Sequence, residues 1–569
     1  MIKINNKKFL LIFLLILSGL FLRAYNPELY VFGFDQVQIL ESAKEIISGN
    51  LTLIGPRTGP AGMFTGPLIY YLAAFLLLII SSPWTIVATS LTISLLTAVS
   101  LYLLVKKHLS EDQALIILLI WALSPFLIYF DRITWNPNLT LLSSALVFFP
   151  LISILKNKSL STVDHLTIAL GGFLGFQAHF SGFLLPALFI GTQLMWKKIN
   201  LKATFFLLAG LGISLIPTFI FDMRHNWLNL RGLQDFLFHR EVVEVSSVWQ
   251  RLISLLDTTI KNIGKTAFFH LSREAIFFTG VLVPTFCLWH ITKIKTASIP
   301  IKLSFSWLVL TIIGFSFYNQ EIPEYYLFIH LPAIMYLFSC LLNTIFKNTL
   351  KISFFIFFTV LFCYLALNHA AIMSRDLFQI GNQLNLVNDI AKLNTKTPVA
   401  AIAYDFQPDV TQIGLRYLIA ERLDKSEDGV VVHIAADIPH TKKYGHLGAW
   451  LDPRSKENTN YLMLNQLIIE TPLAIELRES HLQLEEVDNH KIFNITIEGK
   501  QTSDFLIVVE ETNYFSSKNW TAADFNSHQG YAKQFDQAAL IYITTQQYDE
   551  IAKNLEEIKI YSTQPSLLF

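Results

Sequence analysis

The 569-residue chain has little cysteine and little charge. Its 3 cysteines, Cys287, Cys340 and Cys363, all lie in apolar runs, which argues against a disulfide framework and against a cysteine-based metal centre. Charged residues make up 15% of the chain, well below the roughly 25% of an average soluble protein. With 53% apolar residues and a mean hydropathy of +0.46, the composition indicates a membrane protein that also has a polar part.

The remaining charges divide the chain in two. Residues 1–370 contain 26 basic and 16 acidic residues, whereas the shorter stretch 371–569 contains 17 basic and 27 acidic residues. We therefore predict a helical membrane domain over residues 1–370 and an α/β domain over residues 371–569. The two net charges cancel over the whole chain, and neither indicates a nucleic-acid partner.

The membrane domain is predicted to cross the bilayer with about eleven helices. Its first run, "MIKINNKKFLLIFLLILSGLFLRAY", is basic and then apolar but lacks a small-residue cleavage site, so we interpret it as a retained span. A span needs roughly 17 to 25 mostly apolar residues. The candidates are residues 8–24, 84–105, 113–130, 138–155, 164–180, 182–197, 203–222, 274–292, 302–318, 325–346 and 351–370.

The positions of the lysines decide how a further apolar run, residues 67–82, is interpreted. Short cytoplasmic loops collect Lys and Arg. If this run turns back without crossing, every lysine-bearing connection lies on the side of Lys3, Lys7 and Lys8; those connections begin at residues 106, 156, 197, 292 and 346. We therefore predict an interfacial or re-entrant helix, a cytoplasmic N-terminus and an extracytoplasmic C-terminal domain.

The predicted external loops, residues 25–66 and 223–273 among them, carry a carboxylate and several cations next to aromatic residues. The carboxylate is Asp35 in "VFGFDQVQIL", where burial without a partner would be unfavourable. The cations are Arg57 in "GPRTGP", Arg132 in "DRITWNPN", His179 in "QAHFSG", and Arg224 and His225 in "FDMRHNWLNLRG". Guanidinium groups bind phosphate oxygens bidentately, so together these residues would form a phosphate site beside the membrane.

Two simpler interpretations stay open for these residues. Each arginine taken alone is equally well explained by contact with lipid headgroups, because its apolar stem lies along the membrane surface. Asp35 is also placed to cap a helix over residues 36–48.

Five segments in this order resemble a known family over residues 8–345. They are "FGFDQVQILESAKEIISGNLTLIGPRTGP", "GPLIYYL", "SPFLIYFDRITWNPN", "FDMRHNWLNLRGLQDFL" and "PEYYLFIHLP". Together with the predicted topology they resemble the bacterial glycosyltransferase family 39, the protein O-mannosyltransferase-like family of the GT-C fold.

The resemblance implies an inverting transferase of the bacterial inner membrane. It would move a sugar from a polyprenyl-phosphate carrier to a hydroxyl of a protein, lipid or glycan acceptor on the extracytoplasmic side. Its base would be the carboxylate of the first external loop, Asp35 here. Several members have Asp-Glu where this chain has Asp35 and Gln36, so no second carboxylate is implied there. A divalent metal is left open as a cofactor, with no ligands assigned.

The resemblance also implies which residues line the donor and acceptor pocket. The segment "PEYYLFIHLP" lines the donor pocket in resembling proteins, which points to Glu324, Tyr325 and Tyr326. Gln36 and Asn136 are expected to complete this pocket. Tyrosines at the end of a span are also common as interfacial anchors, and that interpretation stays open for both.

This chemistry fits the residue types. A hydroxyl is a weak nucleophile, and a carboxylate that accepts its proton contributes about 10² to 10⁴-fold to the rate. Partial burial by Phe32 and Phe34 would make Asp35 more basic. The leaving phosphate gains negative charge, which fixed cations stabilise.

The C-terminal domain is predicted from alternating strand-like and helical runs. Strand-like runs are "TPVAAIAYD", "GVVVHIAAD", "DFLIVVEET" and "AALIYITTQQ", and "VTQIGLRYLIAERL" is typical of a helix. No glycine-rich phosphate loop, metal-ligand spacing or nucleophile elbow occurs in this part of the sequence. We expect this domain to shape access of the acceptor.

The sequence argues against two other classes of protein. A transporter or lipid flippase would carry ionisable groups at the membrane midplane in paired halves, whereas here the charges gather at one face and no repeat of the two halves is evident. A scaffold that binds an envelope partner through its C-terminal domain would have no use for Asp35 in an apolar loop.

Overall fold

The structure is a computed structural model. It describes residues 6–57, 63–238, 248–268, 273–293, 298–318, 322–347, 379–396, 399–404, 410–423, 430–435 and 447–451, and individual strands beyond Leu451. The chain forms two compact units: Met1–Val31 with Asp35–Met373, and Phe32–Phe34 with Ser374–Phe569. The predicted span at residues 351–370, which contains Cys363, lies outside the described residues.

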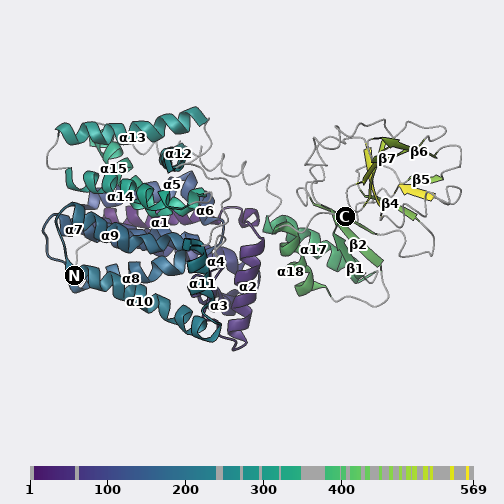
Figure 1. Cartoon of the computed structure of the whole chain (residues 1–569), viewed down its shortest axis with the longest axis horizontal. Coiled ribbons are helices and arrows are strands. Elements are labelled where there is room, and N and C mark those ends of the chain that lie inside the picture. Colours follow the sequence, from purple (N-terminus) through teal and green to yellow (C-terminus); the bar gives the residue numbers. More distant parts are fainter. Residues whose placement is uncertain are drawn as a thin grey trace. The chain divides into compact units, whose positions relative to one another are not determined.

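The first unit is built from helices (Figure 1). Its α-helices are α1 (Asn6–Ala24), α2 (Phe34–Ile47), α3 (Leu68–Ile80), α4 (Thr85–His108), α5 (Glu111–Leu123), α6 (Pro125–Asp131), α7 (Leu139–Leu155), α8 (Thr162–Ala178), α9 (Leu184–Met195), α10 (Leu201–Arg224), α11 (Leu228–Phe238), α12 (Val248–Phe268), α13 (Arg273–Lys293), α14 (Ser298–Ser316) and α15 (Leu331–Lys347). Short 3₁₀ helices are η1 (Pro27–Leu29), η2 (Asn136–Asn138), η3 (Phe180–Phe183) and η5 (Glu324–His330).

Several of these helices have the length and composition of membrane spans. Among the described residues, five segments qualify: Thr85–His108, Asn136–Leu155, Leu201–Arg224, Ile299–Ser316 and Glu324–Asn343. A sixth is α5 with α6, if this pair counts as one span; it is bent by 59° where Ser124 caps α6 and Pro125 begins it.

The sequence predicts more spans than the structure has helices that qualify as spans in its described residues. The expected spans at residues 8–24, 164–180, 182–197 and 274–292 are helical in the structure, as α1, α8, α9 and α13. In the described residues these helices do not combine the required length, low charge and high hydropathy. The chain is therefore a multi-pass helical protein, and the count of eleven stays a prediction.

Ion pairs at both ends of α1 fix the direction of the first helices. Lys8, near the start of α1, pairs with Glu111 at 2.6 Å, and Glu111 also pairs with Lys106 at the end of α4 at 2.9 Å. At the other end of α1, Arg23 pairs with Asp131 at the end of α6. The helices α1 and α4 are therefore antiparallel. The connection between them, which contains α3, leaves and re-enters the bundle at the same end, as the lysine distribution predicts.

The helix α3, in the connection between α1 and α4, is short. The helix has 13 residues and ends at Ser81, whose φ of 47° breaks the helical path before α4 begins. At its start, the backbone N–H of Leu68 donates to Oε1 of Gln177 on α8 at 3.0 Å. The side chain of Gln177 in turn donates to Ser214 on α10 at 2.9 Å, so α3 is fixed to two helices of the bundle.

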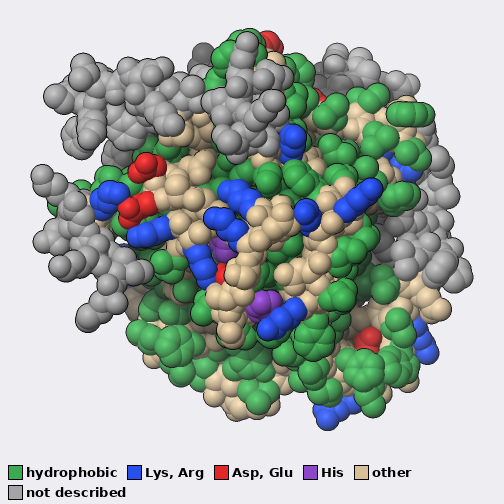
Figure 2. Space-filling model, turned by 90° about the vertical axis from the view of Figure 1, so that its left-hand side faces the viewer, with side chains coloured by type: hydrophobic (Ala, Val, Ile, Leu, Met, Phe, Trp, Pro, Cys, Tyr) green, Lys and Arg blue, Asp and Glu red, His purple; other side chains and the backbone are tan. Residues whose placement is uncertain are grey.

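Basic side chains gather at one end of the first unit, which we call the lysine end. There Lys107 of α4 pairs with Asp164 of α8 at 2.6 Å, and His108 is hydrogen-bonded to Ser153 of α7 at 2.8 Å. Figure 2 shows the face that carries the N-terminus, with Lys and Arg side chains in its middle and hydrophobic side chains around them. The lysine end comprises Lys8, Lys106, Lys107, Lys156, Lys158, Lys197, Lys198 and Lys202.

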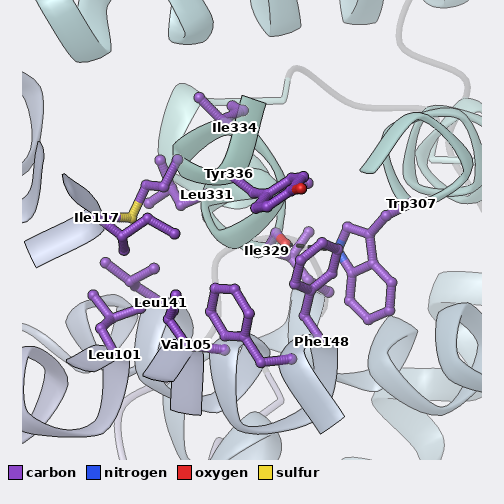
Figure 3. Packing of buried hydrophobic residues seen from close by; sticks show 14 of the residues in the cluster. Leu101, Val105, Ile117, Leu141, Phe148, Trp307, Ile329, Leu331, Ile334 and Tyr336 are labelled. Carbon is purple, nitrogen blue, oxygen red and sulfur yellow. Dashed lines mark hydrogen bonds between the residues drawn. The ribbon is translucent and has the colours of Figure 1, made fainter. Parts of the chain in front are cut away.

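The core of the first unit lies around α7. Every residue of α7 is buried, as expected for a helix that is apolar on all sides. Figure 3 shows Phe148 of α7 next to Trp307 of α14, with ring centroids 5.4 Å apart. The indole N–H of Trp307 donates to the carbonyl of Ile329 at 2.9 Å, which fixes η5 against the core.

The second unit combines helices and sheets. It contains α17 (Ile380–Asn394), α18 (Val410–Arg422), β1 (Val399–Tyr404), β2 (Val430–Ala435), β3 (Gly448–Leu451), β4 (Tyr461–Asn465), β5 (Leu473–Glu476), β6 (Leu482–Val487), β7 (His490–Ile495), β8 (Asp504–Val509), β9 (Asn513–Ser516), β10 (Ala538–Ile543) and β11 (Lys559–Ser562). The sheet orders are β1-β2-β3, β5-β11-β4-β10-β8-β9 and β6-β7. In β1-β2-β3 the first pair is parallel and the second antiparallel. The four strand-like runs of the sequence contain β1, β2, β8 and β10.

The direction of the bundle can be tested by labelling. We expect a membrane-impermeant maleimide to modify Glu28→Cys in intact cells and to leave Lys197→Cys unmodified until the cells are permeabilised, because the two exposed positions lie at opposite ends. Cys287 and Cys340 are buried and contribute little background. Labelling of Lys197→Cys in intact cells would place the lysine end outside and contradict the predicted orientation.

Candidate functional site

Asp35 lies in the first turn of α2, at the end of the unit opposite the lysines. Its side chain is half-buried, and within the described part of the chain no hydrogen bond or ion pair holds its carboxylate. Burial raises the pKa of Asp35, because the charged form loses hydration. The charge of Asp35 acts on the hydroxyls of Tyr70 on α3 and Tyr325 on η5, so two phenols lie near the carboxylate. Such a group is a stronger base than an exposed aspartate.

Aromatic rings form a cluster beside Asp35. The ring of Tyr325 lies 4.5 Å from Trp135, 5.6 Å from His179 and 5.0 Å from Tyr326. The rings of His179 and Tyr326 are 4.4 Å apart. We call Trp135, His179, Tyr325 and Tyr326 the aromatic cluster. It brings together three of the residues that the sequence selected.

His179 occupies this cluster as a neutral ring. Its Nδ1 accepts the backbone N–H of Ser181 at 3.2 Å, so that nitrogen carries no proton. This contact makes His179 the cap of η3. The expected contribution of a positive charge from His179 to a phosphate site therefore has no support in this geometry.

Two polar residues connect the first external loop to the segment after α6. Nε2 of Gln36 donates to the carbonyl of Thr134 at 2.8 Å, and Gln36 is buried. Nδ2 of Asn136 lies 3.4 Å from the hydroxyl of Thr65. The sequence analysis expected Gln36 and Asn136 in the donor and acceptor pocket, and that assignment stays a prediction.

Glu324 is held by α12. Its carboxylate forms an ion pair with Lys265, and its backbone carbonyl accepts a hydrogen bond from Asn262 at 3.3 Å. Because Tyr325 is the next residue, these contacts fix the start of η5 and with it a ring of the aromatic cluster. Lys265 is a cation close to the site that the sequence analysis did not select.

A second group of cations lies on the surface near the end of α10. Arg57 is exposed and forms a β-bridge with Phe64, whose ring lies 5.9 Å from Phe221 of α10. His225 stacks on Phe221 at 3.9 Å, and the neighbouring Arg224 is exposed. We call Arg57, Arg224 and His225 the surface cations.

The turn between α10 and α11 is fixed by hydrogen bonds. The carboxylate of Asp222 accepts the backbone N–H groups of Asn229 and Leu230 at 2.9 and 3.1 Å. The side-chain oxygen of Asn229 accepts the N–H of Phe64 at 2.6 Å, which joins the turn to the first external loop. Asn226 and Trp227 have positive φ angles of 53° and 60°, and Asp222 holds this turn closed.

Arg132 occupies a different place from the one that the sequence suggested. It is buried, and its guanidinium donates to the backbone carbonyls of Arg23, Tyr25 and Asn26 at 3.1, 2.5 and 2.7 Å. The face of the guanidinium lies 4.9 Å from the ring of Tyr30. Its NH1 and NH2 groups therefore point at the protein backbone and not at an open phosphate site.

The residues near Asp35 do not form a metal site. In the described ranges no group of three or more His, Cys, Asp or Glu side chains is arranged to hold an ion. The residue after Asp35 is Gln36, whose amide nitrogen faces a carbonyl. Among the described residues, the donor set next to Asp35 thus does not fit a divalent metal.

Sequence reasoning did not identify Tyr70, Lys265 or the ion pair of Arg23 with Asp131. Tyr70 lies in the quoted run "GPLIYYL", but nothing in that run shows which of its two tyrosines is buried against α2. The hydroxyl of Tyr70 is buried.

Known structures are similar to this chain at low sequence identity. ArnT from Cupriavidus metallidurans bound to undecaprenyl phosphate is 10% identical over 74% of this chain and 92% of that chain, with a TM-score of 0.46. ArnT in the apo state is 13% identical over the same shares, with a TM-score of 0.47. The Archaeoglobus fulgidus oligosaccharyltransferase in complex with Zn and sulfate is 16% identical over 73% of this chain and 57% of that chain, with a TM-score of 0.42. No family model and no curated protein matches the sequence.

The raised pKa of Asp35 can be measured without a substrate. Because burial disfavours the carboxylate, the folded protein should hold the proton of Asp35 to a higher pH than an unfolded chain does. Carbodiimide coupling of a glycine ester, followed by mass spectrometry of the peptide that contains Asp35, should give a midpoint above about 3.9. In urea the midpoint should fall to the ordinary value. Equal midpoints in both states would show that Asp35 is fully hydrated.

Proposed function

We propose that this protein is an inverting membrane glycosyltransferase. It moves a sugar from a polyprenyl-phosphate carrier to a hydroxyl of a protein, lipid or glycan acceptor on the extracytoplasmic side of a bacterial inner membrane. The observation that carries this proposal is Asp35: a half-buried carboxylate of raised pKa, beside the aromatic cluster and at the end of the bundle away from the lysines. The five segments that resemble glycosyltransferase family 39 support the finer assignment to a hexosyl- or pentosyltransferase of that type.

Asp35 acts as the general base in this proposal. It takes the proton of the acceptor hydroxyl while the acceptor oxygen forms a bond to the anomeric carbon of the sugar. The bond between that carbon and the phosphate oxygen breaks, and its electron pair leaves with the polyprenyl phosphate. Attack from the side opposite the phosphate inverts the anomeric centre. The raised pKa of Asp35 brings its basicity closer to that of a group suited to accept a proton near neutral pH.

The aromatic cluster and its neighbours are proposed to hold the sugar. The half-buried ring of Tyr325 offers apolar surface for a pyranose or furanose ring, and the buried ring of Tyr326 packs against it. Gln36, Asn136 and Glu324 lie on the three segments that meet at the cluster, and each already makes one fixed hydrogen bond or ion pair. That fixed geometry is what a site needs in order to orient a sugar before the reaction.

The surface cations are proposed to bind the donor phosphate. Arg57 and Arg224 are exposed, and the contact of Phe64 with Phe221 holds their segments together. An exposed guanidinium at the membrane surface can bind phosphate oxygens bidentately. His225 stacks on Phe221 in the same group. These residues would stabilise the negative charge that grows on the leaving phosphate.

The substitution Asp35→Asn tests the base. The variant keeps the shape of the side chain but cannot accept a proton, so we expect turnover to fall by about 10² to 10⁴-fold. The measurement is release of free carrier, detected by mass spectrometry, from a panel of polyprenyl-phosphate sugars. Binding of undecaprenyl phosphate should change by less than about two-fold, because Asp35 does not contact the phosphate. Turnover close to that of the unsubstituted protein would remove Asp35 from the mechanism.

The substitution Arg224→Ala, alone and with Arg57→Ala, tests the phosphate site. Loss of one charged hydrogen-bonding group should weaken binding of undecaprenyl phosphate by about ten-fold. The double variant should lose more affinity than the single variant. Titration in detergent micelles measures the affinity. Lys261→Ala is the control, since Lys261 is half-exposed and pairs with Asp257 on α12. Unchanged affinity in the double variant would refute this assignment of the surface cations.

A further inference from the structure

Arg132 is a buried cation near the proposed site, and its side chain contacts the first external loop. Only 1% of the residue is exposed. Its two terminal nitrogens donate to three backbone carbonyls, those of Arg23, Tyr25 and Asn26. A guanidinium is planar and presents its donors at fixed angles, so these contacts define the positions of the carbonyls that accept them.

These carbonyls belong to the end of α1 and the residues just after it. The last carbonyls of a helix have no partner within the helix and carry the negative end of its dipole. Arg132 supplies both hydrogen bonds and positive charge at that point. The loop then turns at Asn26, whose φ is 47°, and returns so that the ring of Tyr30 lies against the guanidinium. The hydroxyl of Tyr30 donates back to the carbonyl of Arg23 at 3.1 Å.

The same short segment also holds the chain on the far side of Asp35. Thr134, two residues after Arg132, accepts a hydrogen bond from the side chain of Gln36 through its backbone carbonyl. The segment Arg132–Thr134 therefore contacts the chain before Asp35, through Arg132, and directly after it, through Gln36. A carboxylate that makes no hydrogen bond of its own among the described residues depends on such contacts of its neighbours for its position.

The segment is itself fixed to the bundle by a second buried arginine. Asp131 pairs with the side chain of Arg23 at 2.6 Å, and Arg23 also donates to the carbonyls of Gly19 and Trp121. The guanidinium of Arg23 lies 4.2 Å from the ring centroid of Trp121. Two neighbouring residues at the end of α6 thus contact Arg23: Asp131 pairs with its side chain, and Arg132 donates to its backbone carbonyl.

We propose that Arg132 is a positioning residue that holds Asp35 in place by clamping the loop between α1 and α2. The role of Asp35 rests on the function proposed above, but the clamp itself does not. Arg132 then affects the rate of the chemical step and leaves the affinity for the donor phosphate intact. A displacement of about 1 Å at a reacting group can lower the rate by about 10²-fold, so loosening this loop should act mainly on turnover.

Hydrogen–deuterium exchange tests the clamp in the full-length protein, in detergent and without any ligand. In Arg132→Ala we expect the backbone amides of residues 25–40 to exchange about ten-fold faster or more, with the amides of α7 unchanged. In Arg132→Lys, exchange of residues 25–40 should be faster than in the unsubstituted protein and slower than in Arg132→Ala. An ammonium keeps the charge but lacks the planar pair of donors. Arg224→Ala is the matched control and should leave the exchange rates of residues 25–40 unchanged.

Kinetics supply the second readout, with whichever donor the unsubstituted protein uses. Arg132→Ala should lower kcat by about 10²-fold, while the Kd for undecaprenyl phosphate stays within about two-fold, and Arg132→Lys should recover part of kcat. If Arg132→Ala does not fold, Arg132→Lys is measured together with Gln36→Leu, which removes the contact on the other side of Asp35.

The outcomes separate the two proposals. Unchanged exchange of residues 25–40 in folded Arg132 variants would overturn the clamp. A loss confined to affinity for undecaprenyl phosphate would also overturn it, because Arg132 would then be a phosphate ligand. If the unsubstituted protein transfers no sugar from any donor, the proposed function fails, and the exchange experiment still decides the clamp.

Discussion

The ion pair of Arg23 with Asp131 is the interaction on which the site end of the bundle depends. It joins the end of α1 to the end of α6, and both partners are largely removed from water. Breaking a buried pair by removing one partner typically costs about 3 to 5 kcal/mol, because the remaining charge is left without compensation. This contact places the end of α1, where the loop that carries Asp35 begins, beside the end of α6. The adjacent Arg132 extends it to the backbone of that loop.

The first unit separates its charges by function. At the lysine end, cations pair with Glu111 and Asp164 or face outward, and these contacts join helix ends. At the other end, two arginines are buried and hold backbone groups, and exposed cations lie next to the first external loop. Asp35 is a carboxylate that neither of these arrangements neutralises. In the proposed reaction, that leaves it free to accept a proton from the acceptor hydroxyl.

The sequence predicted the parts of this structure that depend on pattern. Lysine positions predicted that residues 67–82 return without crossing, and the ion pairs of Lys8 and Arg23 give α1 and α4 the corresponding directions. Tyr325 and Tyr326 lie in one aromatic cluster, and their place in a donor pocket stays a prediction. These features are predictable because membrane topology and helical runs depend on residue types that recur along the chain.

The sequence did not predict what each cation does. Arg132 and Arg224 are the same residue type in similar aromatic surroundings, yet one is buried against carbonyls and the other is exposed. That difference depends on which helix end lies opposite, a contact between residues more than a hundred positions apart. His179 was expected to be a cation, but a backbone N–H occupies its Nδ1. The number of spans was also not fixed by hydropathy, because several predicted spans form helices that do not combine the length, low charge and high hydropathy of a span.

The central claim is that Asp35 and the surface cations share one reaction centre while Arg132 stays with the loop. An electron cryo-microscopy structure of the full-length protein with undecaprenyl phosphate tests it most directly. The expected result is phosphate density contacting Arg57 or Arg224 on the side of the unit that holds Asp35, with the contacts of Arg132 to residues 23–26 intact. Phosphate bound at the lysine end, or held by Arg132 after it has left those carbonyls, would contradict the claim.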